Sequence, residues 1–322
     1  MKAAIVFEPG RPPVYGDFRD PVSAPGKSIL RVSASSLSRV TKSRASGTHY
    51  SSQGELPFVP GVDGVGIDEK GRRVYFLFPE APFGAMAEYC LVDEDQYFVL
   101  PDGISDVTAA ALAVPGLSSW AALVERARMV PGETVLINGA TGASGRLAIQ
   151  IAKHLGAKKV IATGRQTAAF DQLRSLGADV TISLVQEKTA LEKAFRDEFR
   201  QGVGIVLDYL WGPSAEALLV AAAQGGPEGV PIRYVQIGSV SGETISLPAA
   251  ALRASALELT GSGMGSLTPG QILKALQGVL GAAPVAQFQI ATDPVPLAEL
   301  ARVWGRNDNG SRIVFLTDAR PG

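Results

Sequence analysis

The sequence contains few of the residues that bind metals or form disulfides. Among 322 residues there is one cysteine, Cys90, and there are two histidines, His49 and His154. A single cysteine excludes an intramolecular disulfide and a closed zinc site of the cysteine-rich kind. Chemistry that needs an imidazole must use one of the two histidines. Because Cys90 lies in the apolar run AEYCLV, we interpret it as a buried core residue rather than a nucleophile.

An excess of charge of one sign and long apolar runs are also lacking. Thirty basic and 31 acidic residues leave a net charge of −1 at pH 7, so no general field attracts nucleic acid or an anionic membrane. The stretch richest in apolar residues, 109–122, is shorter than a membrane span and is broken by Pro115 and Gly116. The first residues have no unbroken apolar run typical of a signal peptide. We therefore expect a cytoplasmic protein that binds neither nucleic acid nor membrane.

Two patterns divide the chain, whose length and 46% hydrophobic content favour two domains with sizeable cores. Short strand patterns separated by proline and glycine predict an antiparallel, β-rich first part: residues 3–7, 28–34, 71–78 and 87–92. After an alanine-rich helix at 106–114, strands alternate with helices, which predicts a parallel sheet. The expected strands are 134–137, 159–163, 180–183, 205–209 and 233–237, with helices at 147–155 and 170–176. The tail predicts a strand at 287–291, a helix at 297–303 and a strand at 312–316.

A glycine-rich loop gives the strongest local signal. In VLINGATGASGRLAIQIAK, residues 135–153, a buried-strand pattern leads into three glycines and then directly into a helix. Glycine permits the tight turn and a close approach of a pyrophosphate, while the helix N-terminus offers free N–H groups. The alternative is a strand–turn–helix whose glycines serve packing alone. The residues expected to bind a dinucleotide are Gly139, Thr141, Gly142, Ala143, Ser144 and Gly145.

The end of the next strand predicts which dinucleotide binds. Enzymes that use NAD commonly place an acidic residue there to bind the adenosine ribose. This sequence reads VIATGR, with Gly164 near that position and Arg165 after it. A guanidinium suits a 2′-phosphate, so we predict NADP(H) as the cofactor. The alternative is that Arg165 is only a solvent-exposed loop residue.

Five segments spread over nearly the whole chain match the motifs of a known family in order and spacing. They are PFVPGVDGVG (57–66), AVPGLSSWAAL (113–123), VPGETVLINGATGASG (130–145), VLDYLWG (206–212) and YVQIGSVSG (234–242). With them the chain resembles the zinc-free quinone oxidoreductase branch of the medium-chain dehydrogenase/reductase superfamily.

The resemblance implies an α/β fold in which a Rossmann doubly wound parallel sheet accompanies a GroES-like β-rich catalytic domain. The implied boundaries are 1–115 and 284–322 for the catalytic domain, and 116–283 for the NADP-binding domain. It also implies an active site in the cleft between the domains and a homodimer. In the segment 234–242, Gly238 and Ser239 are expected to contact the cofactor.

The zinc-dependent relatives bind their metal through a Cys, a His followed by Glu, and a distant Cys or His. Aligning the motifs places Ser38, then Val62 with Asp63, and then Pro115 at those positions. Ser38, Val62 and Pro115 are not a plausible set of zinc ligands, so we expect no bound metal. Hydrogen-bond donors must then stabilise the developing oxyanion.

The sequence departs from the family where such donors are expected. Quinone reductases often carry an Asn and a Tyr in the segment aligned with residues 36–47, whereas this chain has Ser38 and Ser43. Shortly afterwards come His49 and Tyr50, which could donate to a carbonyl oxygen. We therefore take Tyr50, His49 and Ser38 as candidate catalytic residues. The alternative for His49 and Tyr50 is a packing role in the loop.

The predicted function is an NADPH-dependent, zinc-independent transfer of hydride to a small-molecule electron acceptor, either a quinone or an α,β-unsaturated carbonyl. One alternative is an NADPH-binding sensor or structural protein with little turnover. Another is a reductase of ketones or aldehydes. A short-chain dehydrogenase is disfavoured because no tyrosine has a lysine four places later, and a serine hydrolase because G-x-S-x-G is absent.

Overall fold

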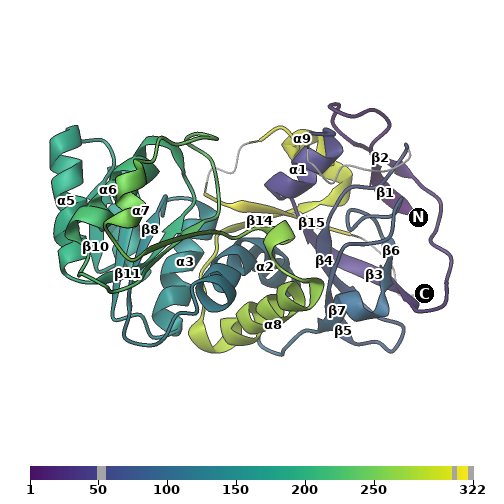
Figure 1. The fold of residues 1–322 in the computed structure, drawn as a ribbon. Coiled ribbons are helices and arrows are strands. Elements are labelled where there is room, and N and C mark those ends of the chain that lie inside the picture. Colours follow the sequence, from purple (N-terminus) through teal and green to yellow (C-terminus); the bar gives the residue numbers. More distant parts are fainter. Residues whose placement is uncertain (49–55, 307–309, 318–322) are drawn as a thin grey trace. The chain divides into compact units, whose positions relative to one another are not determined.

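The computed structural model describes residues 1–48, 56–306 and 310–317, and its elements are labelled in Figure 1. The chain divides into two compact units. One comprises Met1–Val114 with Leu280–Gly322, and the other comprises Pro115–Val279. The two points of division lie inside helices α2 (Asp106–Ala121) and α8 (Pro269–Ala286).

The central unit is built on a six-stranded sheet in the order β10-β9-β8-β11-β12-β13. Every pair of neighbours in it is parallel. Numbered within the unit, this is the 3-2-1-4-5-6 order of the Rossmann fold, so the predicted doubly wound sheet is confirmed. Its strands are β8 (Thr134–Asn138), β9 (Lys159–Gly164), β10 (Val180–Ser183), β11 (Val203–Asp208), β12 (Ile232–Gln236) and β13 (Leu257–Gly261).

Helices connect these strands. They are α3 (Ala143–His154), α4 (Phe170–Ser175), α5 (Lys188–Arg200), α6 (Gly212–Gly225) and α7 (Ala249–Arg253), and α8 follows the last strand, β13. Single 3-10 turns occur at Thr167–Ala169 and Met264–Ser266. The helix α5 is mostly charged, but Phe195 and Phe199, four residues apart on one face, are fully buried in the core. This narrow apolar stripe is enough to hold α5 against the sheet.

Helix α2 differs from the expectation that Pro115 and Gly116 interrupt the apolar stretch. The helix passes through both residues and continues as a π-helical turn, Ala122–Arg126. Ser118 donates a hydrogen bond of 2.8 Å to the Pro115 carbonyl inside the helix. The continuous helix Asp106–Arg126 is long and apolar enough to cross a membrane, but 67% of its most apolar window is buried inside the protein. A core helix has this property.

The outer unit is mainly β-structure. A two-stranded sheet pairs β1 (Lys2–Ile5) with β2 (Val14–Asp17), and a larger sheet has the order β14-β15-β3-β4-β5-β7, with β6 also paired to β3. The larger sheet is antiparallel except at β14 and β15. Its strands are β3 (Lys27–Ser36), β4 (Asp63–Ile67), β5 (Arg73–Leu77), β6 (Tyr89–Asp93), β7 (Tyr97–Val99), β14 (Thr292–Pro296) and β15 (Arg312–Leu316). The helical segments are α1 (Arg39–Ala45), α9 (Leu300–Val303) and 3-10 turns at Glu94–Gln96 and Leu297–Glu299.

The tail contains one wrong prediction. The expected strand at 287–291 is irregular, and the strand β14 follows it instead. Gln287 has a φ of +52°, and Pro294 and Pro296 lie within β14. Proline is tolerated there because β14 lies at the edge of the sheet, where a missing N–H disrupts no inner ladder. Next to β14, β15 pairs with β3, so segments from both ends of the chain share one sheet.

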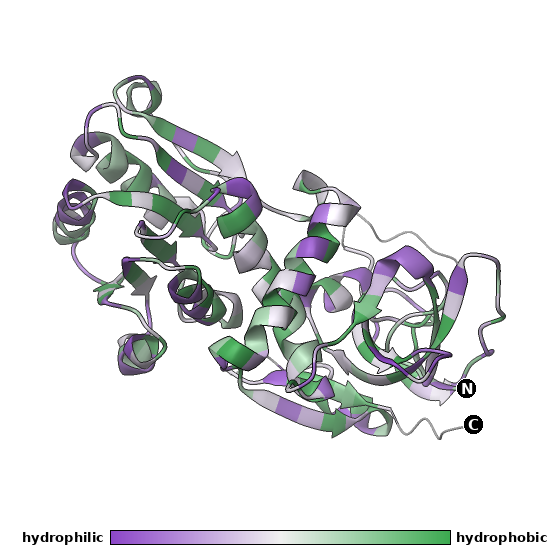
Figure 2. Ribbon diagram, turned by 90° about the horizontal axis from the view of Figure 1, so that it is seen from below, coloured by the Kyte–Doolittle hydropathy of each residue, from purple (hydrophilic) through white to green (hydrophobic). Residues whose placement is uncertain are grey.

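Each unit has its own hydrophobic core. In the central unit the core lies around Leu136, Phe195, Phe199 and Tyr234, and in the outer unit one cluster surrounds Phe315 and Met86. Figure 2 shows that strands and helices of both units carry hydrophobic residues, with hydrophilic residues also present on several helices.

Candidate functional site

The loop between β8 and α3 contains three glycines with three different structural roles. Gly139 has a φ of +92°, and a Cβ there would lie 2.8 Å from the Leu210 side chain. A Cβ at Gly145 would lie 2.5 Å from the Gly139 carbonyl oxygen, so this glycine lets the helix pack onto the turn. A Cβ at Gly142 would meet no heavy atom within 4 Å. A loop that binds a dinucleotide requires three things of its glycines: a tight turn of the backbone, close packing of the helix on the loop, and open space through which the pyrophosphate can approach.

The N-terminus of α3 is suited to an anion. Gly142 is its N-cap residue, and no side chain caps the helix there. The first turn carries no acidic residue, while Lys153 and His154 lie in the last turn. The backbone N–H groups and the positive end of the helix dipole therefore face the open space at Gly142. A pyrophosphate fits this arrangement.

A buried network of hydrogen bonds holds the start of the glycine-rich loop to strand β9. The Asn138 amide, at the end of β8, accepts a 2.8 Å hydrogen bond from the Thr163 hydroxyl in β9. The Thr163 hydroxyl also accepts one of 3.1 Å from the Gly139 N–H, and its carbonyl accepts one of 2.8 Å from the Ala140 N–H. The first half of the glycine loop is therefore held to the neighbouring strand.

Asp208 extends this network to the next strand on the other side. It is fully buried, and its Oδ1 accepts hydrogen bonds from the Asn138 amide at 2.8 Å and the Leu210 N–H at 2.9 Å. The Tyr234 hydroxyl donates to Oδ2 at 2.7 Å, and burial raises the pKa of Tyr234 well above its ordinary value. Asp208 and Asn138 were not among the site residues predicted from the sequence. The available signal was a polar residue at the carboxyl end of each buried strand.

A second contact to the loop comes from Tyr209. Its hydroxyl lies 2.8 Å from that of Ser119, which donates to the Ser144 carbonyl at 3.1 Å. Burial raises the pKa of Tyr209 to about 12, so the phenol keeps its proton at neutral pH. With the Ser119 proton directed at the Ser144 carbonyl, the Tyr209 hydroxyl can donate its hydrogen bond to the Ser119 oxygen. Ser119, Tyr209 and Ser144 come from α2, the end of β11 and the first turn of α3. This chain of hydrogen bonds was also missed, because it joins residues far apart in the sequence.

At the end of β9 the structure gives Gly164 an additional role. A Cβ at Gly164 would lie 2.6 Å from the Thr141 methyl group, so the space beside this glycine is occupied by the loop itself. Arg165 is exposed, and no hydrogen bond or ion pair of its side chain is found within the described part of the chain. The glycine therefore accommodates Thr141, and the guanidinium of Arg165 projects into solvent at the end of the strand.

Gly238 and Ser239 lie in the loop that follows β12, at the carboxyl edge of the same sheet. The Gly238 N–H donates to the Asp208 carbonyl at 3.1 Å, and a Cβ there would lie 2.6 Å from the Tyr209 carbonyl oxygen. Packing against the β11 loop accounts for this glycine. Ser239 is exposed at the same edge.

Of the three candidate catalytic residues, only Ser38 lies within the described residues, because His49 and Tyr50 fall outside them. Ser38 is the N-cap of α1. Its hydroxyl accepts a 3.0 Å hydrogen bond from the Thr41 N–H and lies 2.9 Å from the Thr41 hydroxyl. The residue is buried, so a capping role accounts for it without chemistry. Cys90 is fully buried, and burial raises the pKa of its thiol.

The positions aligned with zinc ligands form no cluster of metal-binding side chains in residues 1–48, 56–306 and 310–317. Val62 is followed by Asp63, a fully buried carboxylate whose Oδ2 accepts a 2.9 Å hydrogen bond from the Tyr75 hydroxyl. Burial raises the pKa of Asp63 to about 6, against the opposing effects of Tyr75 and Arg312.

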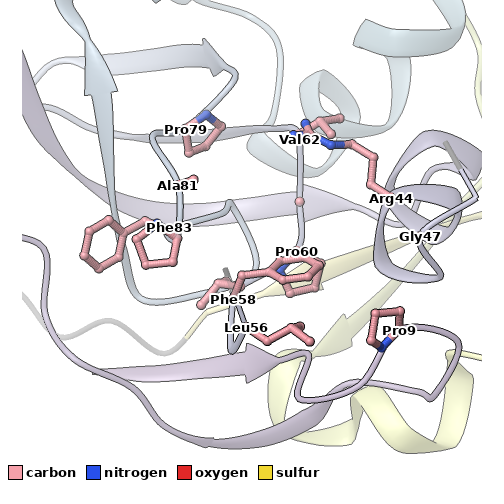
Figure 3. A pocket seen from close by; sticks show the side chains of 13 residues that line it. Pro9, Arg44, Gly47, Leu56, Phe58, Pro60, Val62, Pro79, Ala81 and Phe83 are labelled. Carbon is pink, nitrogen blue, oxygen red and sulfur yellow. The ribbon is translucent and has the colours of Figure 1, made fainter. Parts of the chain in front are cut away.

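A pocket in the outer unit lies beside Val62. Its volume is about 170 Å³. Among the described residues that line it, Arg44 is the charged one, and its side chain extends from the last turn of α1 toward Val62 (Figure 3). The other described residues that line it are Pro9, Gly47, Leu56, Phe58, Val59, Pro60, Gly61, Pro79, Ala81, Pro82 and Phe83.

Comparison with known proteins agrees with the fold and the loop. The family described as Zinc-binding dehydrogenase matches residues 143–279. The chain is 31% identical to the probable NADPH-dependent quinone reductase tdiC of Emericella nidulans, over 98% of this chain and 100% of that protein. It is 34% identical to 2-methylene-furan-3-one reductase of Solanum lycopersicum, over 49% of this chain and 45% of that protein. The solved structure of the quinone oxidoreductase from Thermus thermophilus, which was also determined in complex with NADPH, is 28% identical, with a TM-score of 0.78 over 98% of this chain and 100% of that one.

A two-unit fold of this kind, with a Rossmann sheet and a β-rich partner, defines a medium-chain dehydrogenase/reductase. Within that superfamily the chain belongs to the quinone oxidoreductase family, as the full-length relative shows. The resemblance inferred from the sequence motifs is thereby confirmed.

Proposed function

We propose that this protein is an NADPH-dependent oxidoreductase that reduces a quinone or an α,β-unsaturated carbonyl compound without zinc. The observation that carries the proposal is the open position at Gly142 in front of the uncapped N-terminus of α3. Two similar proteins support the proposal by their names. The full-length relative from Emericella nidulans is a probable NADPH-dependent quinone reductase, and the solved structure from Thermus thermophilus is a quinone oxidoreductase with its NADPH complex. The tomato relative, named for its reduction of an enone-type furanone, supports the wider acceptor range.

The residues of the glycine loop would hold the pyrophosphate of the cofactor. Gly142, Ala143 and Ser144 offer backbone N–H groups, and Thr141 adds a hydroxyl. Arg165, exposed at the end of β9, would pair with the 2′-phosphate. When bound, NADPH supplies the hydride that an electron-poor acceptor takes up. The acceptor needs a proton donor, for which Tyr50 and His49 remain our candidates.

A turnover screen tests the function and separates it from its alternatives. Purified protein is mixed with NADPH or NADH and with a quinone, an enone, a simple ketone or an aldehyde, and the loss of reduced-cofactor absorbance is followed. We expect turnover with NADPH and the first two acceptors. Turnover with only the ketone or aldehyde would favour a carbonyl reductase. Quenching of NADPH fluorescence without any turnover would favour a sensor.

The metal-free character is a separate part of the proposal, supported by Ser38, Val62 and Pro115 at the aligned ligand positions. Serine, valine and proline side chains do not form a zinc site. We expect elemental analysis to find no stoichiometric zinc, and turnover to persist after treatment with a chelator. One tightly bound zinc per chain together with chelator-sensitive turnover would exclude this part of the proposal.

We also propose a homodimer in the cytoplasm. The strand β13 ends the six-stranded sheet, and its outer edge has no partner strand in the described part of the chain. Such an edge can pair with the same edge of a second copy. The one cysteine is buried and free, as is usual in a reducing compartment. Light scattering during gel filtration would measure the mass, and a monomer would exclude the dimer.

A further inference from the structure

Trp211 has a backbone conformation that few residues other than glycine adopt. It lies between β11 and α6, with a φ of +58° and a ψ of −161°. A side chain is strongly disfavoured in this region, because its Cβ atom crowds the neighbouring peptide groups. Gly212, which follows it, also has a positive φ of +63°. Such a conformation persists only where surrounding contacts hold it, and it occurs preferentially at binding and switch sites.

Asp208 supplies the contacts that hold this turn. Its Oδ1 accepts hydrogen bonds from the N–H groups of Leu210 at 2.9 Å and of Trp211 at 3.1 Å. The same oxygen accepts the bond of 2.8 Å from the Asn138 amide, and Asp208 is fully buried. Because water does not reach a buried carboxylate, donors that leave it are not replaced, and the bonds are costly to break. The half-buried Trp211 side chain adds to the hold, since it packs against the core of the central unit.

The turn contacts both loops that are expected to bind the cofactor. On one side, a Cβ at Gly139 would lie 2.8 Å from the Leu210 side chain, so this side chain packs against the start of the glycine-rich loop. On the other side, the Leu210 carbonyl accepts a hydrogen bond of 2.8 Å from the Ser241 N–H, in the loop that follows β12. A Cβ at Gly212 would lie 2.8 Å from the Ser241 carbonyl oxygen. A change in the backbone of the turn would therefore disturb its contacts with both loops.

We propose that Asp208 is a positioning residue for the cofactor, and that it acts by holding Trp211 in its strained conformation. Without the carboxylate the turn relaxes to an ordinary conformation, and the two loops lose the contacts that fix them relative to each other. The cofactor then binds only the fraction of molecules in which the turn is still formed, and the apparent affinity falls in proportion to that fraction. This role rests on the proposed function only in that the ligand is NADPH, and its binding tests require no turnover.

Two variants of Trp211 test whether the turn is strained. Trp211→Ala and Trp211→Gly both remove the indole, but only glycine adopts this conformation without a steric conflict. In an ordinary loop alanine gives the more stable protein, because glycine has more conformational freedom to lose on folding. Here we expect the reverse order, with Trp211→Gly unfolding at a temperature about 2–4 °C higher than Trp211→Ala. An equal or lower unfolding temperature for Trp211→Gly would show that the turn is not strained and would overturn the proposal.

Double variants test whether Asp208 acts through Trp211. Asp208→Ala should weaken NADPH binding by about tenfold in a titration that follows NADPH fluorescence, as expected if about a tenth of the molecules keep the turn. Adding Trp211→Gly should recover most of this loss, since a glycine turn forms without the carboxylate. Adding Arg128→Gly instead is the matched control, because Arg128 is exposed, has a positive φ of +50° and precedes β8, away from both loops. Only Trp211→Gly should recover the affinity.

A conservative variant tests the hydrogen bonds. The amide oxygen of Asp208→Asn can accept the same bonds from the Leu210 and Trp211 N–H groups, and its NH₂ group can donate to the Tyr234 hydroxyl. NADPH affinity should therefore stay within about threefold of wild type. If Asp208→Ala does not fold, Asp208→Thr replaces it in every comparison, because its hydroxyl can accept one of the two N–H bonds and its volume is similar to that of aspartate.

The outcomes separate this role from a general loss of packing and from the proposed function. Recovery of affinity by both glycine substitutions, or by neither, would overturn the action of Asp208 through Trp211. An Asp208→Asn protein that binds NADPH as weakly as Asp208→Ala would overturn the hold by hydrogen bonds. The expected binding pattern without turnover of any acceptor would refute the proposed function and leave this role standing. Turnover together with affinities that do not follow the pattern would do the opposite.

Discussion

The hydroxyl of Tyr209 lies 2.8 Å from the hydroxyl of Ser119, and through Ser119 it reaches the carbonyl of Ser144 in the first turn of α3. Tyr209 follows Asp208, which holds Asn138 at the start of the glycine loop. Two adjacent residues at the end of β11 therefore fix the two ends of the loop. The position of the α3 N-terminus depends on both.

Removing the two hydroxyls one at a time should give unequal effects. Tyr209→Phe deletes one hydrogen bond, whereas Ser119→Ala deletes that bond and the one to Ser144. At about 1 kcal/mol for each net hydrogen bond, the free energy of unfolding should fall by about 1 and about 2 kcal/mol, respectively. NADPH affinity should weaken more for Ser119→Ala. Urea denaturation measures the free energy of unfolding, and fluorescence titration measures the NADPH affinity. Equal losses for the two variants would argue against a chain of hydrogen bonds from Tyr209 through Ser119 to Ser144.

Two glycine-to-alanine variants should separate folding from cofactor binding. At Gly145 a Cβ would lie 2.5 Å from a carbonyl oxygen, so Gly145→Ala should cost about 1–3 kcal/mol of stability through overpacking. At Gly142 the backbone φ of −78° suits alanine and a Cβ meets no neighbour, so stability should change by less than about 0.5 kcal/mol. The methyl group of Gly142→Ala would nevertheless stand where the pyrophosphate approaches, and NADPH affinity should fall by about tenfold, the effect of about 1.4 kcal/mol.

The interpretation of the loop would be wrong if these effects were exchanged. A stable Gly145→Ala protein would mean that α3 can move away from β8. Unchanged NADPH affinity in Gly142→Ala would mean that the cofactor does not approach the loop at this glycine. Thermal unfolding without cofactor gives the stability of each variant independently of its binding.

Local patterns in the sequence predicted the parallel sheet and the glycine loop. The alternation of strands and helices after residue 133 is local information, and β8, β9 and α3 lie close to their expected positions. The helix α5 was not predicted, because KTALEKAFRDEFR has only a narrow apolar stripe. In β14, two prolines concealed a strand that its place at the sheet edge permits.

The parts of the site that the sequence did not predict depend on contacts between distant residues. The sequence identified Gly164 only as standing near the position of the acidic residue of NAD enzymes, and only the structure shows the Thr141 methyl group beside it. The bond between Ser119 and Tyr209 joins residues that are 90 positions apart. The pocket around Arg44 also combines several separate segments. No spacing within a single segment encodes such contacts.

The buried carboxylate of Asp63 should make stability depend on pH. Its pKa is raised from 3.8 to about 6 in the folded protein, so between these values the folded state binds more protons than the unfolded state. Stability should therefore fall as pH rises through this range, by about 3 kcal/mol at about 1.4 kcal/mol per pKa unit. Burial raises the pKa of Tyr75, which donates to Asp63, well above its ordinary value, so Tyr75 keeps its proton over this range.

Asp63→Asn is the matched variant, since its amide oxygen can still accept the hydrogen bond from Tyr75. Urea titration from about pH 4 to about pH 7 measures the free energy of unfolding of both proteins. As pH rises, the wild type should lose stability relative to Asp63→Asn, because only the wild type has a carboxyl group at this position. A difference that stays constant across this range would show that Asp63 does not titrate as described.

The preference for NADPH over NADH should depend on Arg165. The side chain is exposed and has no ion-pair partner within the described residues, so its guanidinium is available to a 2′-phosphate. A charged hydrogen bond is worth about 1.5–3 kcal/mol, and solvent exposure places the effect at the lower end. Arg165→Ala should weaken NADPH binding by about tenfold, leave NADH binding almost unchanged, and make the affinity for NADPH less sensitive to salt. Equal losses for both cofactors would show that Arg165 does not recognise the phosphate.

The contact between Gly164 and Thr141 determines how the cofactor preference can be reversed. An aspartate at position 164 should repel the 2′-phosphate and accept hydrogen bonds from the ribose of NADH. Its Cβ would lie 2.6 Å from the Thr141 methyl group, so Gly164→Asp alone should lower stability by about 1–3 kcal/mol. Thr141→Ser removes that methyl group and keeps the hydroxyl. We therefore expect the double variant to recover stability and to prefer NADH, as measured by thermal unfolding and by titration with each cofactor. If Gly164→Asp alone is as stable as wild type, the Thr141 methyl group does not restrict this position.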